Sequence, residues 1–582
     1  MIKKLYDTVT ELEREYQTNE LEIIDGIKFS TYNEIKETIF MTNSRYMNLK
    51  DEPYYNIVNA NVNIAVVAQD FDRKDINIFS DNPDDDVASF VMRRALDNYM
   101  DKVGFGKFQN EAGEARARYG GVLVKKCYEK IDGERVPKPE VVKWTNIAYV
   151  NTSDIDSGLI VEKKSINITE VLEKRDIWDN FEEALELFNN KKLFEEVTLY
   201  EMHGVLPKKF MKDIEGEYDE ETKEYSQQFH TILTDNKKHV HVWSEEEDES
   251  PYKYKAYIEI DGRGLGMGVV ESNKWAQISI NDAVLGEREA FALGRKVMFK
   301  TTSKTIADNA LSDVDNGHIF KLKQGEDINI LNTITGNLPE FSNLINKWQV
   351  QADRSVAITD ALRGETPPSG QAYKLGALVT QQSASSFDYL AEGIAFLYED
   401  ICRDWIMPYL IKKYNKKGLI TSDLFSAEEL IQIDTKYATK RANDIVKKQM
   451  LEGKHITQEK YDQLVEGFKK IISSTNTRTL EIDEDGLFKG YEGRVRFIIS
   501  NETKNKLSIL ESLSKILSDV SSNPAILTDP SLRQIFGKIL ELSGAGISLN
   551  QLSPVQVESA GGVSEQMKST AQPLPGPRAV TA

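Results

Sequence analysis

Residues 337–371 read NLPEFSNLINKWQVQADRSVAITDALRGETPPSGQ, and two strong structural signals meet in this stretch. Asn337 to Glu340 has the residue types of a helical capping box, with Pro339 tolerated in the first turn. Apolar residues then recur at helical spacing: Phe341, Leu344, Ile345, Trp348, Ala352 and Val356. We expect this helix to end at Gly364, a good residue for a left-handed cap, just before Pro367 and Pro368.

A second and much longer helix is predicted to begin near Gln371. From Ala372 to Tyr414 it would span roughly 65 Å at 1.5 Å per residue. We expect Pro408 to kink it or to end it early. Apolar residues mark one face of this helix: Phe387, Leu390, Ile394, Leu397, Ile401, Trp405 and Tyr409.

Another helix and a small αβ insert precede residue 337. The helix is predicted from Glu271 to Leu293, ending at Gly294. The insert holds a helical turn and three short candidate strands: Ile306 to Leu311 for the turn, and Lys296 to Lys300, Gly317 to Leu322 and Asp327 to Leu331 for the strands.

The first 270 residues mix helices and strands. We predict helices at Ile2 to Leu21, after the acidic cap Asp84-Asp85-Asp86, and at Lys107 to Tyr119. The last of these breaks at Gly120-Gly121 into a strand, Val122 to Tyr128. Further strands are expected at 229–233 and 238–243, which would form a hairpin, and at 254–260, where apolar and polar residues alternate.

The last third, Thr421 to Leu542, is expected to be mostly helical with one hairpin. Strands around Leu480 and Val495 would flank the turn Asp483-Glu484-Asp485-Gly486. From Pro554 onward the composition favours a flexible tail. The fold class predicted for the whole chain is α+β.

Composition limits the class of function. The 582 residues suffice for about three or four domains at ~150 residues each. The net charge of −20 argues against tight generic DNA binding, which depends on cationic groups that displace phosphate counterions. Two cysteines give no disulfide framework, and we expect neither export nor a membrane span, because no signal peptide or long apolar stretch is present.

Several short motifs suggest chemistry but fit it poorly. The glycines at 262, 264, 266 and 268 lack the context of a dinucleotide site, so we interpret them as a strand-to-helix bend where backbones pack closely. Gly104-Phe105-Gly106-Lys107 lacks the remaining residues of a phosphate loop. His239 and His241 would share one strand face without a third metal ligand, and an exposed face is the favoured interpretation. We predict no catalytic residues, no metal and no cofactor.

The order of elements from Glu271 to Tyr414 resembles that of the portal proteins of tailed double-stranded DNA bacteriophages. The likeness is carried by a helix, a small αβ insert, a capped helix, a Gly/Pro loop and a very long helix. The segment Arg363 to Gln371, running into Ala384-Ser385-Ser386-Phe387, is similar to the corresponding stretch of that family.

The resemblance implies an architecture of mixed α/β wing, helical stem, small αβ clip, long kinked wing helix and mainly helical crown. It assigns 1–270 to the N-terminal wing region, 271–294 to the first stem helix, 295–336 to the clip, 337–363 to the second stem helix, 364–373 to the tunnel loop, 374–420 to the long wing helix, 421–553 to the C-terminal wing and crown, and 554–582 to the flexible tail.

The same resemblance implies a role without enzymatic activity. Portal proteins form a homo-oligomeric ring, usually of twelve subunits, at one vertex of the virion capsid. The terminase motor packages double-stranded DNA through the ring, and the DNA is later ejected through it. Implied partners are the major capsid protein, terminase, head-tail adaptor or tail proteins, and DNA bound without sequence preference, with no membrane. Synthesis would occur in the host bacterial cytoplasm. A different multimeric virion assembly or scaffold protein is the alternative.

The tunnel loop is the predicted DNA-channel site. Pro367 and Pro368 restrict the backbone, while Gly364 and Gly370 permit bends at either end. We expect weak contacts to phosphates from the cations that flank the loop, or alternatively pairing of those cations with a neighbouring subunit. The candidate residues are Arg363, Gly364, Glu365, Thr366, Pro367, Pro368, Ser369, Gly370, Gln371 and Lys374.

Overall fold

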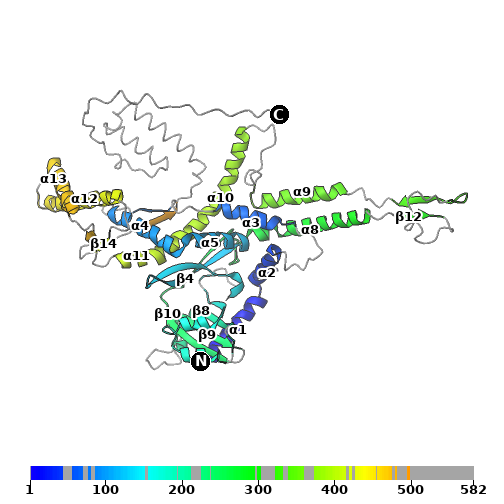
Figure 1. The fold of residues 1–582 in the computed structure, drawn as a ribbon, viewed down its shortest axis with the longest axis horizontal. Helices are drawn as coiled ribbons and strands as arrows, with labels where there is room; N and C mark the ends of the chain where they lie inside the picture. The colour runs from blue at the N-terminus through cyan, green and yellow to red at the C-terminus, as the bar shows by residue number, and fades with distance from the viewer. Residues whose placement is uncertain are drawn as a thin grey trace, which may run out of the picture. The chain divides into compact units, whose positions relative to one another are not determined.

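The computed structural model of the chain divides into two compact units, 1–499 and 500–582. The second unit, which includes the predicted flexible tail, lies outside the described residues. Within the first unit the structure describes residues 2–43, 55–69, 76–79, 86–150, 155–156, 158–189, 191–192, 194–211, 224–235, 238–294, 298–302, 321–331, 338–358, 373–414, 419–421, 427–453, 455–474, 479–481 and 494–497. These residues form an α+β structure, as predicted (Figure 1).

The largest sheet has five antiparallel strands in the order β10-β9-β8-β7-β6. Helix α1 (Ile2–Thr18) packs on one face through Leu5, Val9 and Leu12, while α6 (Ile168–Glu173) and α7 (Phe181–Glu186) pack on the other. Figure 1 shows α1 beside β8, β9 and β10. The strand bounds are β6 Ile147–Tyr149, β7 Ile160–Ile166, β8 Val197–Pro207, β9 Tyr225–Asp235 and β10 Lys238–Glu246.

The predicted hairpin is confirmed. Strands β9 and β10 pair antiparallel, with Asp235 opposite Lys238 at the turn. The register shifts between His241 and Trp243, so one residue bulges out of the ladder.

A second sheet of three strands, in the order β11-β4-β5, lies between helices. Strand β4 (Gly121–Ile131) pairs with β11 (Tyr252–Ala256) and β5 (Glu134–Val141). Its core is shared with α4 (Asp86–Val103), α5 (Phe105–Tyr119) and α10 (Tyr373–Ile401). The strand predicted at 254–260 is shorter than expected, because the chain leaves the sheet after Ala256 and only a single bridge follows, between Ile258 and Met267.

The break between α5 and β4 occurs where it was predicted. Gly120 caps α5 with a φ of 88°, a left-handed conformation that favours glycine. A Cβ atom on Gly268 would lie 2.6 Å from the Gly120 nitrogen, and one on Gly266 would lie 2.5 Å from the Gly120 carbonyl oxygen. The glycine run is therefore the close-packed bend that the sequence predicted, directly before α8 (Val269–Gly294).

The hairpin predicted around Leu480 and Val495 is wrong. Strand β15 (Thr479–Glu481) pairs with β14 (Leu419–Thr421), and β16 (Arg494–Phe497) pairs with β3 (Ile76–Phe79). Both strands are short, and each pairs with a strand far away in the sequence instead of with its neighbour. The nearby helices are α12 (Ala427–Leu451) and α13 (Gln458–Ser474), which pack against each other.

The remaining elements are short or belong to the helical layer. They are β1 (Leu21–Ile24) paired with β2 (Ile27–Phe29), α2 (Thr31–Thr42), α3 (Ile57–Ala68), the 3-10 turns at Trp144–Asn146 and Lys208–Phe210, β12 (Met298–Thr301) paired with β13 (Ile328–Leu331), α9 (Leu338–Ser355) and α11 (Met407–Tyr414).

Candidate DNA-channel site

The predicted channel residues Arg363 to Gln371 lie outside the described residues. Lys374 belongs to the first turn of α10, and its place in that helix is all that is described of it. The two helices that flank the loop, α9 and α10, are described, and α8 packs against α9.

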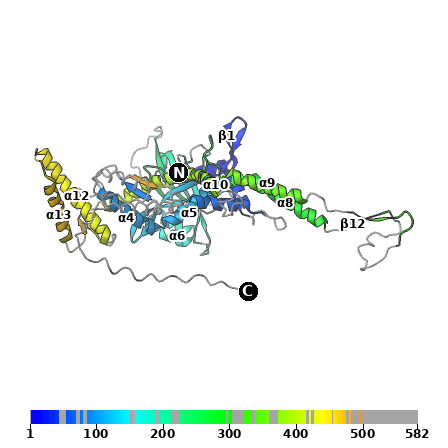
Figure 2. The same cartoon turned by 90° about the horizontal axis from the view of Figure 1, so that it is seen from above.

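Helices α8 and α9 lie side by side in both views (Figures 1 and 2). Gly286, which interrupts the apolar pattern of α8, lies against Phe341 of α9. A Cβ atom there would lie 2.9 Å from the ring of Phe341 on α9. The glycine therefore makes room for an aromatic ring from the partner helix, which stabilises the pair at a modest cost in helix propensity.

Of the three strands predicted in the insert between these helices, two are confirmed. Strands β12 and β13 pair in register, with Met298 opposite Leu331. Lys321 and Leu322, the described part of the third candidate strand, are not in a strand. The predicted helical turn from Ile306 to Leu311 lies outside the described residues.

Helix α9 starts as predicted but ends nine residues before Gly364, at Ser355. Ala357 adopts a φ of 55°, and the Ile358 amide donates to the Asp353 carbonyl while the Ala357 amide donates to the Arg354 carbonyl. This is a Schellman cap with alanine where glycine is usual. Ile358 is buried in the core that α9 shares with α3 and α8. This burial offsets the backbone strain at Ala357, so tertiary packing ends the helix.

The inner ends of α8 and α9 are held by polar contacts to neighbouring helices. The side-chain oxygen of Gln277 accepts hydrogen bonds from the first amides of α3, at Ile57 and Val58. Asn61 donates to Asp353, and Lys274 pairs with Glu37 on α2. Since these contacts join α8 and α9 to α2 and α3, which are distant from them in sequence, the helix pair is anchored at this end.

Large apolar side chains remain exposed along the helix pair. Trp275 is 67% exposed and Phe291 52%, both on α8, while Leu344 and Val350 on α9 are 41% and 47% exposed. These side chains are available for contact with another protein.

The charges on α8 and α9 are mixed and slightly acidic. The two helices together carry six carboxylates and four cationic groups. The carboxylates are at 271, 282, 287, 289, 340 and 353, and the cationic groups are at 274, 288, 347 and 354. A surface with this balance binds DNA phosphates weakly, because few counterions would be released on contact.

Helix α10 carries the apolar face that was predicted. Phe387, Ile394, Leu397 and Ile401 are all buried, and Trp405 continues the stripe. Of the two outcomes predicted for Pro408, the early end is wrong, because the helical stretch continues to Tyr414 as α11. Since proline cannot donate to the preceding turn, the helix widens there into a π-helical segment, Cys402–Ile406.

Arg116 connects α10 to α5. Its guanidinium is buried and donates to Leu390 O on α10 at 2.7 Å, to Gln69 Oε1 at 2.7 Å and to Ala256 O at 2.9 Å. Burial lowers the pKa of Arg116 to about 10, against the opposing effect of nearby tyrosines, so the group stays charged at neutral pH. No local pattern marks Arg116 for this role, because it looks like any other basic residue on an amphipathic helix.

A buried ion cluster joins the two large sheets. Lys125 on β4 contacts Glu162 on β7 at 2.7 Å and Glu201 on β8 at 2.6 Å. Lys164 also contacts Glu201, at 2.7 Å, and the Tyr252 hydroxyl donates to Glu162 at 2.5 Å.

Burial alone would lower the pKa of Lys125, but the charges of Glu201 and Glu162 outweigh burial and raise that pKa. Burial likewise opposes ionisation of Glu201, yet the two lysines hold its pKa below the ordinary value.

Three histidines, His203, His230 and His241, lie beside this cluster. The interpretation of His241 as exposed is wrong. His241 is buried and its Nε2 lies 3.1 Å from His230 Nδ1. His203 Nδ1 lies 3.1 Å from Glu247 Oε1, and His203 stacks on Phe229. His239 stacks on Tyr6 of α1. Within the described part of the chain, no group of three or more His, Cys, Asp or Glu side chains is arranged to hold a metal ion.

The chain matches no protein-family model, and no curated protein sequence is significantly similar to it. Among the helices in the described residues, none is both long and apolar enough to span a bilayer.

Proposed function

We propose that this chain is one subunit of a phage portal: a ring at a single capsid vertex that serves as a passive conduit for double-stranded DNA. The observation that carries the proposal is the succession of α8, the paired strands β12 and β13, α9, the segment 359–372 and the long helix α10. In this assignment α8 and α9 form the stem, the strand pair belongs to the clip, and 364–373 is the tunnel loop.

The exposed apolar residues of α8 and α9 support a multimer. A closed ring needs two different surfaces on each subunit, one matching the other on its neighbour. Trp275 and Phe291 on one helix, with Leu344 and Val350 on the other, would supply buried anchors for such contacts. In a ring, neighbouring copies of the chain would cover the apolar side chains that α8 and α9 leave exposed.

The charge balance supports a conduit in preference to a DNA-binding enzyme. A ring that lets DNA slide must hold it weakly, and both the chain and its α8–α9 pair are acidic. Terminase, capsid protein and tail proteins would then dock on the outside of the ring, and the motor activity would reside in terminase.

Negative-stain imaging of the purified protein tests the proposal directly. We expect rings with a central hole wide enough for a DNA duplex. Particles without a hole, or filaments, would instead favour the second candidate, another multimeric assembly or scaffold protein. The exposed apolar faces of α8 and α9 are compatible with that candidate too, so the central hole is the deciding observation.

A further inference from the structure

One face of the hairpin formed by β4 and β5 carries a row of cationic side chains around an aromatic ring. Lys126, Tyr128 and Lys130 alternate along β4, so their side chains point to the same face of the sheet. Arg135 on β5 lies directly opposite Lys130 and shares that face. We call these four residues the hairpin stripe.

The hairpin stripe is accessible to solvent. Lys130 and Arg135 are exposed, Lys126 is partly exposed and Tyr128 is 49% exposed. The Arg135 guanidinium lies 4.2 Å from the centre of the Tyr128 ring, and the Lys126 ammonium lies 5.9 Å from it. Because a guanidinium over an aromatic face is attracted to the ring, Tyr128 limits the orientations of Arg135.

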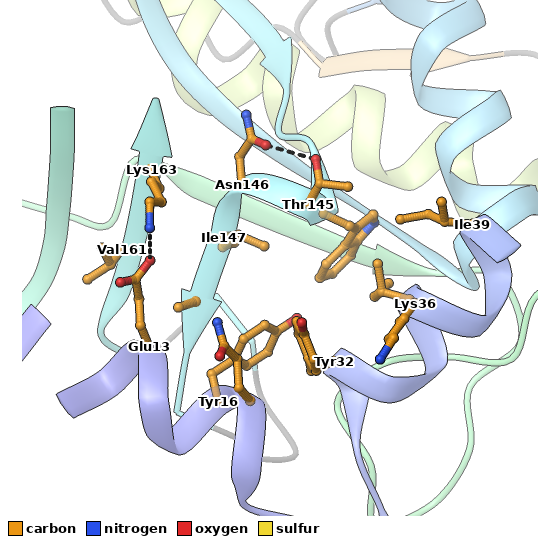
Figure 3. A pocket seen from close by; sticks show the side chains of 14 residues that line it. Glu13, Tyr16, Tyr32, Lys36, Ile39, Thr145, Asn146, Ile147, Val161 and Lys163 are labelled. Atoms are coloured by element: carbon orange, nitrogen blue, oxygen red, sulfur yellow. Dashed lines mark hydrogen bonds and ion pairs between the residues drawn. The ribbon is translucent and has the colours of Figure 1, made fainter. Parts of the chain in front are cut away.

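The cations of the hairpin stripe have no carboxylate partners. Each of three carboxylates in the same hairpin forms an ion pair with a lysine outside the stripe: Glu129 with Lys138, Asp132 with Lys102 and Glu134 with Lys413. On the five-stranded sheet Lys163 is likewise compensated, by Glu13 at 3.1 Å (Figure 3). By contrast, no carboxylate among the described residues forms an ion pair with Lys126, Lys130 or Arg135.

Lys130 and Arg135 form a cross-strand pair of like charges. The Cβ atoms of directly opposite residues are roughly 4.5–5.5 Å apart, and like charges at this separation destabilise a sheet. An anion bound between the two groups would remove the repulsion. The pair is therefore unfavourable in the free protein and becomes favourable when an anion is bound.

The linear arrangement of these cations suits a linear polyanion. Alternate residues of a strand are roughly 6.6 Å apart, close to the separation of successive phosphates along a nucleic-acid strand. A guanidinium also matches phosphate oxygens with two parallel hydrogen bonds. An acidic protein segment would need apolar anchors in addition to charge, and the stripe offers only Tyr128. The features of the stripe therefore favour nucleic acid over an acidic protein.

We propose that the hairpin stripe binds the phosphate backbone of double-stranded DNA without reading its sequence. Lys126, Lys130 and Arg135 contact phosphates, and Tyr128 orients Arg135. The acidic run at 245–249 precedes Pro251, whose carbonyl accepts from the Lys126 amide, and these nearby charges keep the contact weak. The stripe lies on β4 and β5, outside the elements assigned to the channel, so this proposal stands or fails independently of the portal assignment.

Fluorescence anisotropy of a labelled DNA duplex of mixed sequence, titrated with the full-length protein at several low salt concentrations, tests the proposal. Three phosphate contacts predict a slope of about −2.7 for the logarithm of affinity against the logarithm of salt concentration. Lys130→Gln combined with Arg135→Gln should weaken binding about tenfold and reduce the magnitude of the slope by about 2.

A matched double variant controls for the change in net charge. Lys174→Gln combined with Arg175→Gln also removes one exposed lysine and one exposed arginine, and Arg175 lies over the ring of Phe181. This variant should bind DNA as the unmodified protein does.

Single variants separate a role in binding from a role in folding. Lys130→Gln removes the like-charge repulsion, so its urea midpoint should equal or exceed that of the unmodified protein while its DNA affinity falls. Tyr128→Phe keeps the ring and should retain affinity, whereas Tyr128→Ala should weaken it.

Three results would overturn the proposal: no DNA binding at the lowest salt concentration, equal losses in the two double variants, or an unchanged slope after Lys130 and Arg135 are replaced. Binding to poly-glutamate in place of DNA would overturn it too, because the partner would then be an acidic protein segment.

Discussion

The Arg116 guanidinium on α5 donates to the backbone carbonyl of Leu390 on α10 at 2.7 Å, across 274 positions of sequence. Gly393 makes this approach possible, since a Cβ atom there would lie 2.6 Å from Arg116 Nη2. The long helix α10 is therefore fixed to α5 by a buried cation as well as by its apolar face.

Replacing Arg116 should destabilise the protein strongly. In Arg116→Met the apolar stem remains, but Gln69 and the Ala256 carbonyl lose a buried donor. We expect a loss of about 3 kcal/mol or more in the free energy of unfolding, measured by urea denaturation. The control Arg403→Met removes a surface cation whose pairs are exposed, and should cost about 0.5 kcal/mol or less. Equal losses in the two variants would contradict the role assigned to Arg116.

The buried ion cluster around Lys125, between the two large sheets, leads to a second prediction. Glu201→Gln leaves Lys125 and Lys164 facing one carboxylate, Glu162, in a buried setting. We expect a loss of about 3 kcal/mol, because breaking a buried pair on one side leaves uncompensated charge. Glu129→Gln is the matched control, since its partner Lys138 is partly exposed and the pair is on the surface. A loss below about 1 kcal/mol for Glu201→Gln would show that the cluster is solvated.

His230 should make stability depend on pH. Burial, with His241 and His203 as further causes, lowers the pKa of His230 to about 3. The unfolded chain takes up a proton near pH 6.5, whereas the folded protein does not, so acid favours unfolding. Between pH 7 and pH 5 this group alone should cost up to about 2 kcal/mol.

Urea midpoints at pH 7 and pH 5 measure this effect. His230→Gln should be less stable at pH 7 but should show a smaller drop on going to pH 5. An unchanged pH dependence in the variant would mean that other groups cause it.

The proposed subunit interface predicts that Trp275→Glu will impair ring formation. A buried aromatic anchor contributes about 2 kcal/mol to an interface, or roughly thirtyfold in the dissociation constant. Phe194→Glu is the control, because Phe194 is 88% exposed and lies outside the α8–α9 pair. Particle images at matched concentrations should show fewer rings for Trp275→Glu alone. Intact rings at every concentration would place the interface elsewhere.

The tunnel loop remains a prediction from the sequence. Replacing Pro367 and Pro368 with Gly should loosen the tip, and Lys374→Glu should repel phosphates. In a packaging assay we expect shorter or poorly retained DNA, while ring formation continues. Normal packaging in both variants would show that the loop does not act on DNA.

Local signals in the sequence determined much of the fold. Helix α9 begins at Leu338, where the residue types at 337–340 predicted a helix start. The glycines at 120 and 121 end α5, and the hairpin of β9 and β10 forms where its turn residues predicted it. Each of these features depends on backbone geometry and hydrogen bonds within a few residues, so neighbouring positions suffice to predict it.

Contacts between distant residues decided the rest. Helix α9 ends at Ser355 because Ile358 is buried, and β15 and β16 pair with remote strands instead of each other. Lys125 and Arg116 can be buried because other sheets and helices supply their polar partners. The free energy of burying a charge depends on which groups surround it in space, and no local pattern in the sequence encodes that arrangement.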